Sequence, residues 1–184
     1  MFKDKYRIES ARLSGWDYSA AGFYFVTICT RGRVCCLGDV VETEAHLSPI
    51  GEIVAAEWMK AEEVRKNVQM DEWIIMPNHL HGIIVIKYAI NKGDVDPRGE
   101  TFQRNVSTSP SRLKPNTIGS MIGQIKSNAT KKIRAAGYPD FDWQERFWDE
   151  IIWDERGLNN VRQYIRDNPA KWESDRDNAP GLWM

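Results

Sequence analysis

Two histidines separated by one residue lie near the middle of the chain, where they could bind a metal ion together. His79 and His81 flank Leu80, and the apolar run Ile83-Ile84-Val85-Ile86 follows closely. Four β-branched residues without a proline predict a β-strand, and strand residues i and i+2 project from the same face. Both imidazoles could therefore share one divalent cation. Taken alone, such a pair is more often two ordinary polar residues near a strand end, because short motifs match by chance.

A second pair of chemically capable residues lies near the end of the chain. The sequence from Glu155 to about Asn168 predicts a helix that ends or kinks at Pro169. Tyr164 and Asn168 are four residues apart and so share one helix face. Each is ordinary on its own, since a helical Tyr is usually core and an Asn before proline is usually a cap. Beside the histidine strand, however, Asn168 could give a metal a neutral oxygen and Tyr164 could face a phosphate held there.

Three motifs occur in order along the chain: Met76-Pro77-Asn78-His79-Leu80-His81, Trp143-Gln144-x-Arg146-Phe147 and Tyr164-Ile165-x-x-Asn168-Pro169. Together they resemble the signature of the REP-associated tyrosine transposases. These enzymes are relatives of the small insertion-sequence transposases in the HUH (His-hydrophobic-His) endonuclease superfamily. The similarity runs from the predicted strand at Phe23 to Trp172. The sequence departs from the family pattern in a long segment at 88–116 and in Gly82, where many relatives carry a bulkier residue.

The resemblance implies a fold and a reaction. The fold would be ferredoxin-like α+β, with a central antiparallel sheet, helices mainly on one face, and a single catalytic domain over residues 1–184. His79, His81 and Asn168 would hold Mg²⁺ or Mn²⁺. Tyr164 would attack single-stranded DNA at a hairpin or palindrome, leaving a 5′-phosphotyrosine and a free 3′-OH. Monomers and homodimers both occur among the relatives, so the oligomeric state stays open.

Two other functions remain as alternatives at the level of sequence. One is a non-catalytic or domesticated regulatory protein that binds DNA hairpins on the same fold. The other is a metal-dependent hydrolase of small phosphoesters, which would lack the salt-sensitive binding typical of DNA-binding proteins.

Positive charge is concentrated in one part of a nearly neutral chain. The net charge is -1, yet ten basic and three acidic residues lie between Lys87 and Arg134, which gives this segment +7. Such a segment is either a polyanion-binding surface or a solvated loop and helix face. The candidate phosphate contacts are Arg31, Arg33, Arg112, Lys114, Lys126, Lys131, Lys132 and Arg134.

The amino-acid composition indicates the class of protein and its cellular compartment. The 184 residues are 42% hydrophobic and 28% charged, which is typical of a globular domain. No apolar run is long enough for a membrane span, and the N-terminal residues do not resemble a signal peptide. Three cysteines, two of them adjacent, favour a reducing cytoplasm. We therefore expect a cytoplasmic protein of bacterial type, associated with the nucleoid and not with a membrane.

The remaining helices and strands are predicted from apolar periodicity and from the residues that form turns and caps. We expect a mobile basic loop at 88–116, a tail at 173–184 and a structural or surface role for His46. The aromatic residues of 141–153 would form core or stack on bases. The predicted elements are a strand at 23–30, a hairpin of 34–37 with 40–46 around Gly38-Asp39, a Ser48-capped helix to about 67 with an acidic outer face, a strand at 68–76, a Thr117-capped helix to about 136, and a strand within 143–153.

Overall fold

The computed structural model describes residues 13, 15–89 and 116–174 of the chain. Most of the predicted basic loop, with Arg112 and Lys114, and most of the tail lie outside these residues. The described elements, in order, are β1 (Gly22–Cys29), η1 (Arg31–Arg33), β2 (Gly38–Val41), β3 (Glu44–Leu47), α1 (Pro49–Val64), β4 (Val68–Met76), β5 (His79–Ile86), α2 (Ile118–Ala135), β6 (Trp148–Ile152), α3 (Glu155–Asp167) and η2 (Pro169–Ser174).

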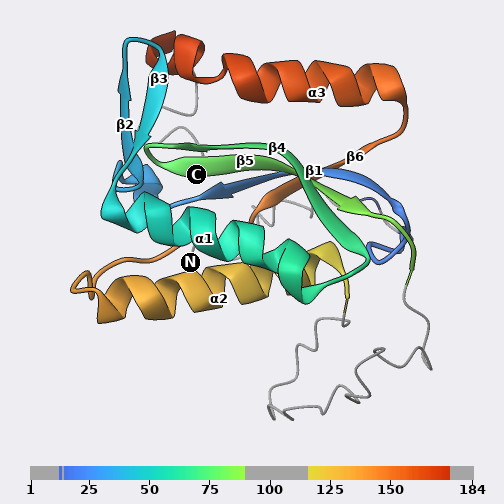
Figure 1. Ribbon diagram of the computed structural model, residues 1–184, viewed down its shortest axis with the longest axis horizontal. Helices are drawn as coiled ribbons and strands as arrows, with labels where there is room; N and C mark the ends of the chain where they lie inside the picture. The colour runs from blue at the N-terminus through green and yellow to red at the C-terminus, as the bar shows by residue number, and fades with distance from the viewer. Residues whose placement is uncertain (1–12, 14, 90–115, 175–184) are drawn as a thin grey trace, which may run out of the picture.

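A four-stranded antiparallel sheet in the order β4-β5-β1-β6 forms the centre of the molecule. The predicted α+β class is confirmed. This strand order, with the first and third strands of the sheet at its centre, is the ferredoxin-like arrangement. Helices α1 and α2 cover one face, as predicted, and α3 lies on the other (Figure 1). A separate two-stranded ribbon of β2 and β3 stands at one end of the sheet.

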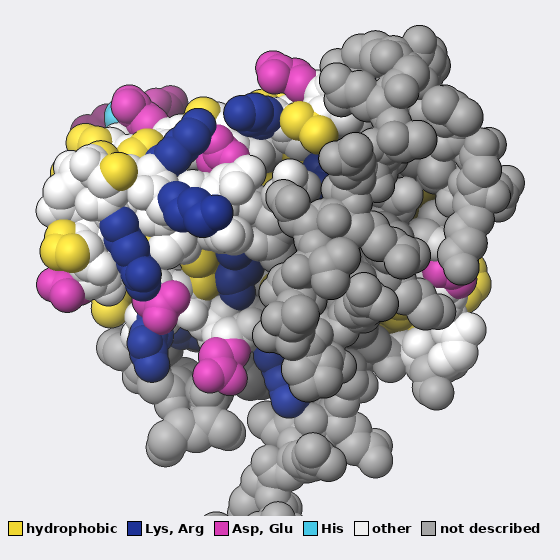
Figure 2. All heavy atoms as spheres, turned by 90° about the horizontal axis from the view of Figure 1, so that it is seen from below, with side chains coloured by type: hydrophobic (Ala, Val, Ile, Leu, Met, Phe, Trp, Pro, Cys, Tyr) yellow, Lys and Arg dark blue, Asp and Glu magenta, His cyan; other side chains and the backbone are white. Residues whose placement is uncertain are grey.

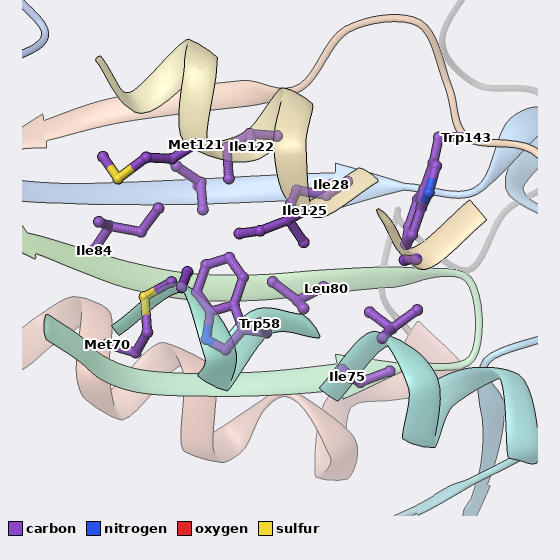
Figure 3. Close-up of a cluster of buried hydrophobic side chains, with 14 of the residues drawn as sticks. Ile28, Trp58, Met70, Ile75, Leu80, Ile84, Met121, Ile122, Ile125 and Trp143 are labelled. Carbon is purple, nitrogen blue, oxygen red and sulfur yellow. The ribbon is translucent and has the colours of Figure 1, made fainter. Parts of the chain in front are cut away.

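The main core fills the space between the sheet and helices α1 and α2 (Figure 3). Strand β5 alternates, so Leu80 and Ile84 enter this core and are completely buried. Trp58 of α1 packs against the same strand at Gly82, where an added Cβ would lie 2.4 Å from the Trp58 ring. The departure from the family pattern at Gly82 therefore makes room for this indole.

A smaller apolar cluster attaches α3 to the opposite face. It joins Phe25, Ile83, Ile152, Leu158 and Ile165, with partly buried neighbours around them. The odd-numbered positions of β5 thus face α3, and the histidines share that face.

Two ion pairs add to the contact between α3 and the edge strand β4. The register of β4 against β5 shifts between Met70 and Trp73, so Asp71 and Glu72 occupy a bulge. Asp71 accepts hydrogen bonds from the Nε and Nη2 atoms of Arg162 at 3.1 and 2.5 Å. Glu72 accepts one from Nε of Arg166 at 2.8 Å. Because the arginines are four residues apart on α3, they meet the two consecutive carboxylates of the bulge together.

The predicted turn of the small hairpin was wrong. Gly38 lies inside β2 and pairs with Leu47, whereas the turn is formed by Glu42 and Thr43 with φ of 49° and 72°. Gly38 is needed for close approach, since an added Cβ would lie 2.1 Å from the backbone oxygen of His46. Gly38 therefore allows the two strands to approach closely, and it does not form the turn.

The predicted caps of α1 and α2 are confirmed: the side chains of Ser48 and Thr117 accept hydrogen bonds from backbone N–H groups in the first turns of these helices. Asp154 caps α3 in the same way. The predicted acidic outer face of α1 was wrong for Glu57. That residue is 3% exposed and pairs with Lys132 of α2 at 2.5 Å, because α2 packs beside this side of α1.

Candidate active site

His79, the first residue of β5, is held as a neutral imidazole in the interior. It is completely buried, and its Nδ1 lies 2.7 Å from Oδ1 of Asn78. An amide oxygen only accepts, so Nδ1 carries the proton and Nε2 carries the lone pair. Nε2 has no hydrogen-bond partner among the described residues. Burial, with a smaller effect from the positive charge of Arg33, lowers the pKa of His79 to about 3.

His81 lies directly beside His79 and connects it to the tyrosine of α3. The two imidazole rings are 4.3 Å apart between centroids. Nδ1 of His81 lies 2.8 Å from the hydroxyl of Thr27 on β1, and Nε2 lies 3.3 Å from the hydroxyl of Tyr164. If Thr27 accepts from Nδ1, then Nε2 has the lone pair and Tyr164 donates to it. Phe25 packs against both the His81 and Tyr164 rings.

Tyr164 combines a ring packed against its neighbours with partial exposure of the residue to solvent. It is 37% exposed, while its ring lies 5.3 Å from that of His81. A nucleophile must be both positioned and reachable by its substrate. Tyr164 meets both conditions on the described surface.

Asn168 lies between Tyr164, which contacts His81, and Trp172, which packs against His79. It is the C-cap of α3, one turn after Tyr164, and is 1% exposed. Four residues later, the Trp172 ring of η2 packs 6.0 Å from the His79 ring. Asn168 therefore follows the tyrosine beside His81 and precedes the indole beside His79.

The donor set fits a divalent cation. Two imidazoles on one strand face, one of them with a buried unpartnered Nε2, are suitable ligands, and an Asn side chain offers a neutral oxygen. Within the described ranges, no three His, Cys, Asp or Glu side chains gather to hold a metal. The ion would therefore need ligands from the amide and from substrate or water. The Nε2 lone pair of His81 cannot bind a cation and the Tyr164 hydroxyl together.

The predicted phosphate contacts within the described residues lie at two places. Arg31 and Arg33 follow β1 near the histidine end of the sheet, and Arg33 is the one whose charge acts on His79. The other four lie on α2, across the sheet from the histidines, and Figure 2 shows Lys and Arg side chains gathered on the face seen from the α2 side.

Most of these basic groups also contact the protein. Arg31 pairs with Asp142 at 2.9 Å, and Arg134 donates to the backbone oxygen of Phe141. Lys126 donates to the backbone oxygens of Gln144 and Arg146. Their role in phosphate binding stays a prediction.

Sequence reasoning did not identify Asn78 and Thr27 as residues of this site. Asn78 directly precedes His79, so its position in the short β4–β5 connection was a usable signal. Thr27 is 54 residues from His81, and only the pairing of β1 with β5 places them opposite each other. The outcome for the aromatic segment is mixed: Phe141 and Trp143 are buried, while Trp148 and Trp153 are exposed.

Comparison with known proteins finds similarity both in sequence and in structure. No family model matches the sequence. A Haemophilus influenzae protein, described as uncharacterized, is 32% identical over 168 residues, which cover 91% of each chain. A solved structure of a REP-associated tyrosine transposase bound to a REP hairpin superimposes with a TM-score of 0.55 at 21% identity, over 92% of this chain and 74% of that one. A putative transposase from Deinococcus radiodurans gives a TM-score of 0.41 at 13% identity, over 86% and 97%.

No helix in the described part of the chain is long and apolar enough to cross a membrane.

Proposed function

The chain belongs to the family of the Haemophilus influenzae protein and has the fold of the REP-associated tyrosine transposase, and from this premise we propose that it is a metal-dependent single-stranded DNA endonuclease and strand transferase. Its substrate is DNA at hairpin or palindromic sequences, and Tyr164 is the nucleophile. The structural relative was solved with a REP hairpin, which supports a hairpin as the substrate class.

One observation carries the proposal. The hydroxyl of Tyr164 lies 3.3 Å from Nε2 of His81, and the His79 ring lies 4.3 Å from that of His81. Three residues from two motifs more than 80 positions apart therefore meet on one face of the sheet. A structural tyrosine would not need a buried imidazole at its hydroxyl and a second buried imidazole next to the first.

The bond changes are those of a transesterification. The Oη atom of Tyr164 bonds to the phosphorus, and the bond from phosphorus to the 3′ oxygen breaks. The phenolic proton ends on that oxygen, so the products are a 5′-phosphotyrosine and a 3′-OH. The phenolate is a better leaving group than an alkoxide, so a 3′-OH can reverse the reaction and rejoin strands.

The protein would supply position and neutral ligands. His79, His81 and Asn168 would hold Mg²⁺ or Mn²⁺, and the bound cation would neutralise charge on the phosphate and polarise its oxygens. Asn78 and Thr27 fix the orientations of the two imidazoles. Since one Nε2 lone pair cannot serve two partners, a cation held by Nε2 of His81 would replace the hydrogen bond between this atom and the Tyr164 hydroxyl.

Covalent capture of DNA tests the proposal. A labelled hairpin pool with randomised loop and flanks is incubated with Mn²⁺ and the wild-type protein, then run on a denaturing gel. We expect a covalent protein–DNA band that is lost with EDTA, with His79→Ala and with Tyr164→Phe. Tyr138→Phe is the matched control, because Tyr138 is 40% exposed and follows α2 on the other side of the sheet.

Two results would contradict the proposed reaction or its nucleophile. Tight hairpin binding without any covalent band would favour the regulatory binding protein. A covalent band that persists in Tyr164→Phe would refute the assignment of the nucleophile.

A further inference from the structure

Trp148, at the start of the edge strand β6, is a large aromatic residue that the fold leaves 54% exposed. Within the described ranges, its indole has no hydrogen bond and no ring contact with another residue. Trp153, just after the same strand, does have such a contact, because Trp16 packs edge-on against it with 5.1 Å between the ring centroids. One exposed apolar side chain is ordinary by itself. The position of Trp148 is what gives it meaning.

The strand register places Trp148 in the same row of the sheet as His81. Thr27 of β1 pairs with His81 of β5 on one side and with Trp148 of β6 on the other. Directly paired residues of antiparallel strands project from the same face, so Trp148 shares the face of the histidines and Tyr164. Two strand spacings, about 10 Å, separate the backbones of His81 and Trp148. The exposed indole therefore belongs to the surroundings of the candidate active site.

Helix α3 covers this face unevenly. Its backbone lies closest to β4 and β5, and its two arginine–carboxylate pairs hold it to the β4 bulge. The half of the face formed by β1 and β6 is more open at the level of His81. There Thr27 is partly buried, while Trp148 and Glu150 are exposed.

Tyr164 borders this open part of the face. Its ring packs edge-on against Phe25 of β1, with 6.1 Å between the ring centroids. Phe25 in turn pairs with Glu150 of β6. A DNA strand that presents a phosphate to the partly exposed Tyr164 can therefore extend over β1 and β6, where Trp148 lies.

An unpaired nucleobase is the partner that these side chains fit. A flat, exposed indole offers a stacking surface for a base of a single strand, whereas the faces of bases in a duplex are already stacked. Glu150 is two residues from Trp148 on the same face and is exposed. Its negative charge repels phosphates, so a base and not the sugar–phosphate backbone should face this pair.

We propose that Trp148 is a substrate-positioning residue, whose indole stacks on one unpaired base of the DNA strand that presents its phosphate to Tyr164. This inference rests on the proposed function for its choice of partner. Stacking would fix the strand on the open half of the face and so hold the phosphate within reach of the tyrosine.

An abasic scan measures this stacking without cleavage. In a Tyr164→Phe background with EDTA, fluorescence anisotropy gives the affinity for a hairpin chosen from the randomised pool and for copies that each lack one unpaired base. Loss of one particular base should weaken binding by about 5- to 150-fold. Trp148→Leu should weaken binding of the intact hairpin by a similar factor and should show no further loss with that abasic copy.

Two further variants separate stacking from structural damage. Trp148→Tyr keeps an aromatic ring and should retain most of the affinity and the sensitivity to the same abasic position. Trp153→Leu is the matched control, because it removes the other exposed indole of this segment. It should bind every copy as the background protein does.

Several results would overturn the inference. One is a Trp148→Leu variant that still loses affinity at every abasic position to which the background protein is sensitive. Another is a Trp148→Leu variant with the background abasic pattern but weaker self-association in sedimentation, which would assign the indole to a contact between copies of the chain.

The scan and the covalent assay distinguish this inference from the proposed function. An abasic position that depends on Trp148, without a covalent adduct in the wild-type protein, would leave the role of Trp148 standing and refute the proposed reaction. A covalent adduct without any such position would do the reverse.

Discussion

Each histidine of the candidate site has a polar partner on one ring nitrogen, and these partners decide what the other nitrogen can do. Asn78 accepts from Nδ1 of His79, and Thr27 lies beside Nδ1 of His81. Groups of this kind set ring orientation and tautomer, and their loss from metal sites costs about 10- to 100-fold in affinity or activity.

Thr27→Val tests this role with little change in shape. We expect Mn²⁺ affinity, measured from the electron paramagnetic resonance signal of free Mn²⁺, to fall by about 10- to 100-fold. Thr130→Val is the control, because its hydroxyl donates to the Lys126 backbone oxygen on α2. Unchanged affinity in Thr27→Val would mean that the hydroxyl does not position His81.

The low pKa of His79 makes stability depend on pH. Burial holds its pKa near 3 in the folded protein, against an ordinary value of 6.5. Between these values only the unfolded state binds the proton, so this stabilisation is complete above pH 6.5 and is lost toward pH 3 by about 1.4 kcal/mol per pH unit.

Urea unfolding at pH 7 and pH 5 measures this contribution. The wild-type free energy of unfolding should fall by about 2 kcal/mol more than that of His79→Gln over this interval. His46→Gln, on the exposed hairpin, should keep the wild-type pH dependence. The same loss in all three proteins would show that His79 is protonated when folded.

At the scale of elements, the position of the tyrosine depends on how α3 docks on the sheet. The helix has only a small apolar cluster of its own and two arginine–carboxylate pairs with the β4 bulge. These pairs are partly exposed, so each contributes about 1 kcal/mol or less. Together they fix the register of Tyr164 against His81.

Asp71→Asn/Glu72→Gln tests this attachment. Amide hydrogen exchange in α3 should become faster, with a loss of about 1–2 kcal/mol in its opening free energy and little change in α2. Asp167→Asn, which removes a more exposed pair with Lys171, is the control and should have a smaller effect. Unaltered exchange in α3 would assign its docking to the apolar cluster alone.

Most helices and strands could be predicted from the sequence, but which of them become neighbours in the fold could not. Apolar periodicity and local end signals predicted β4, α2 and α3 with nearly correct bounds, because these signals are local. The pairing of Glu57 with Lys132, and of the β4 bulge with α3, depends on which elements become neighbours. The hairpin turn was missed because Glu42 and Thr43 adopt positive φ without a glycine. For the site, the two histidines and the tyrosine could be predicted from motifs, while Thr27 required the strand register.

At the scale of the whole molecule, the sheet separates two chemically different faces. One face carries α3 and the histidine–tyrosine cluster, and the other carries α1, the basic helix α2 and the main core (Figure 1). Gly82 lies on the core side of the histidine strand, where Trp58 closes over it. Packing on the core side therefore fixes the strand from which both imidazoles project.

Gly82→Ala tests this coupling of the layers. The added methyl group overlaps the Trp58 ring, so we expect a loss of about 1–3 kcal/mol in the free energy of unfolding, measured with urea. Trp58→Leu should recover part of that loss in the double variant, because it removes the overlapping atoms. A full, additive loss in the double variant would contradict this explanation.

The central claim is that Tyr164 becomes covalently linked to DNA, and mass spectrometry of the digested adduct tests it most directly. After reaction with the hairpin pool and nuclease trimming, we predict a 5′-phosphonucleotide on the tryptic peptide 163–166, attached to Tyr164. Tyr138 in its own peptide should remain unmodified. An adduct on another residue, or a cleaved DNA strand with no protein attached, would contradict the account.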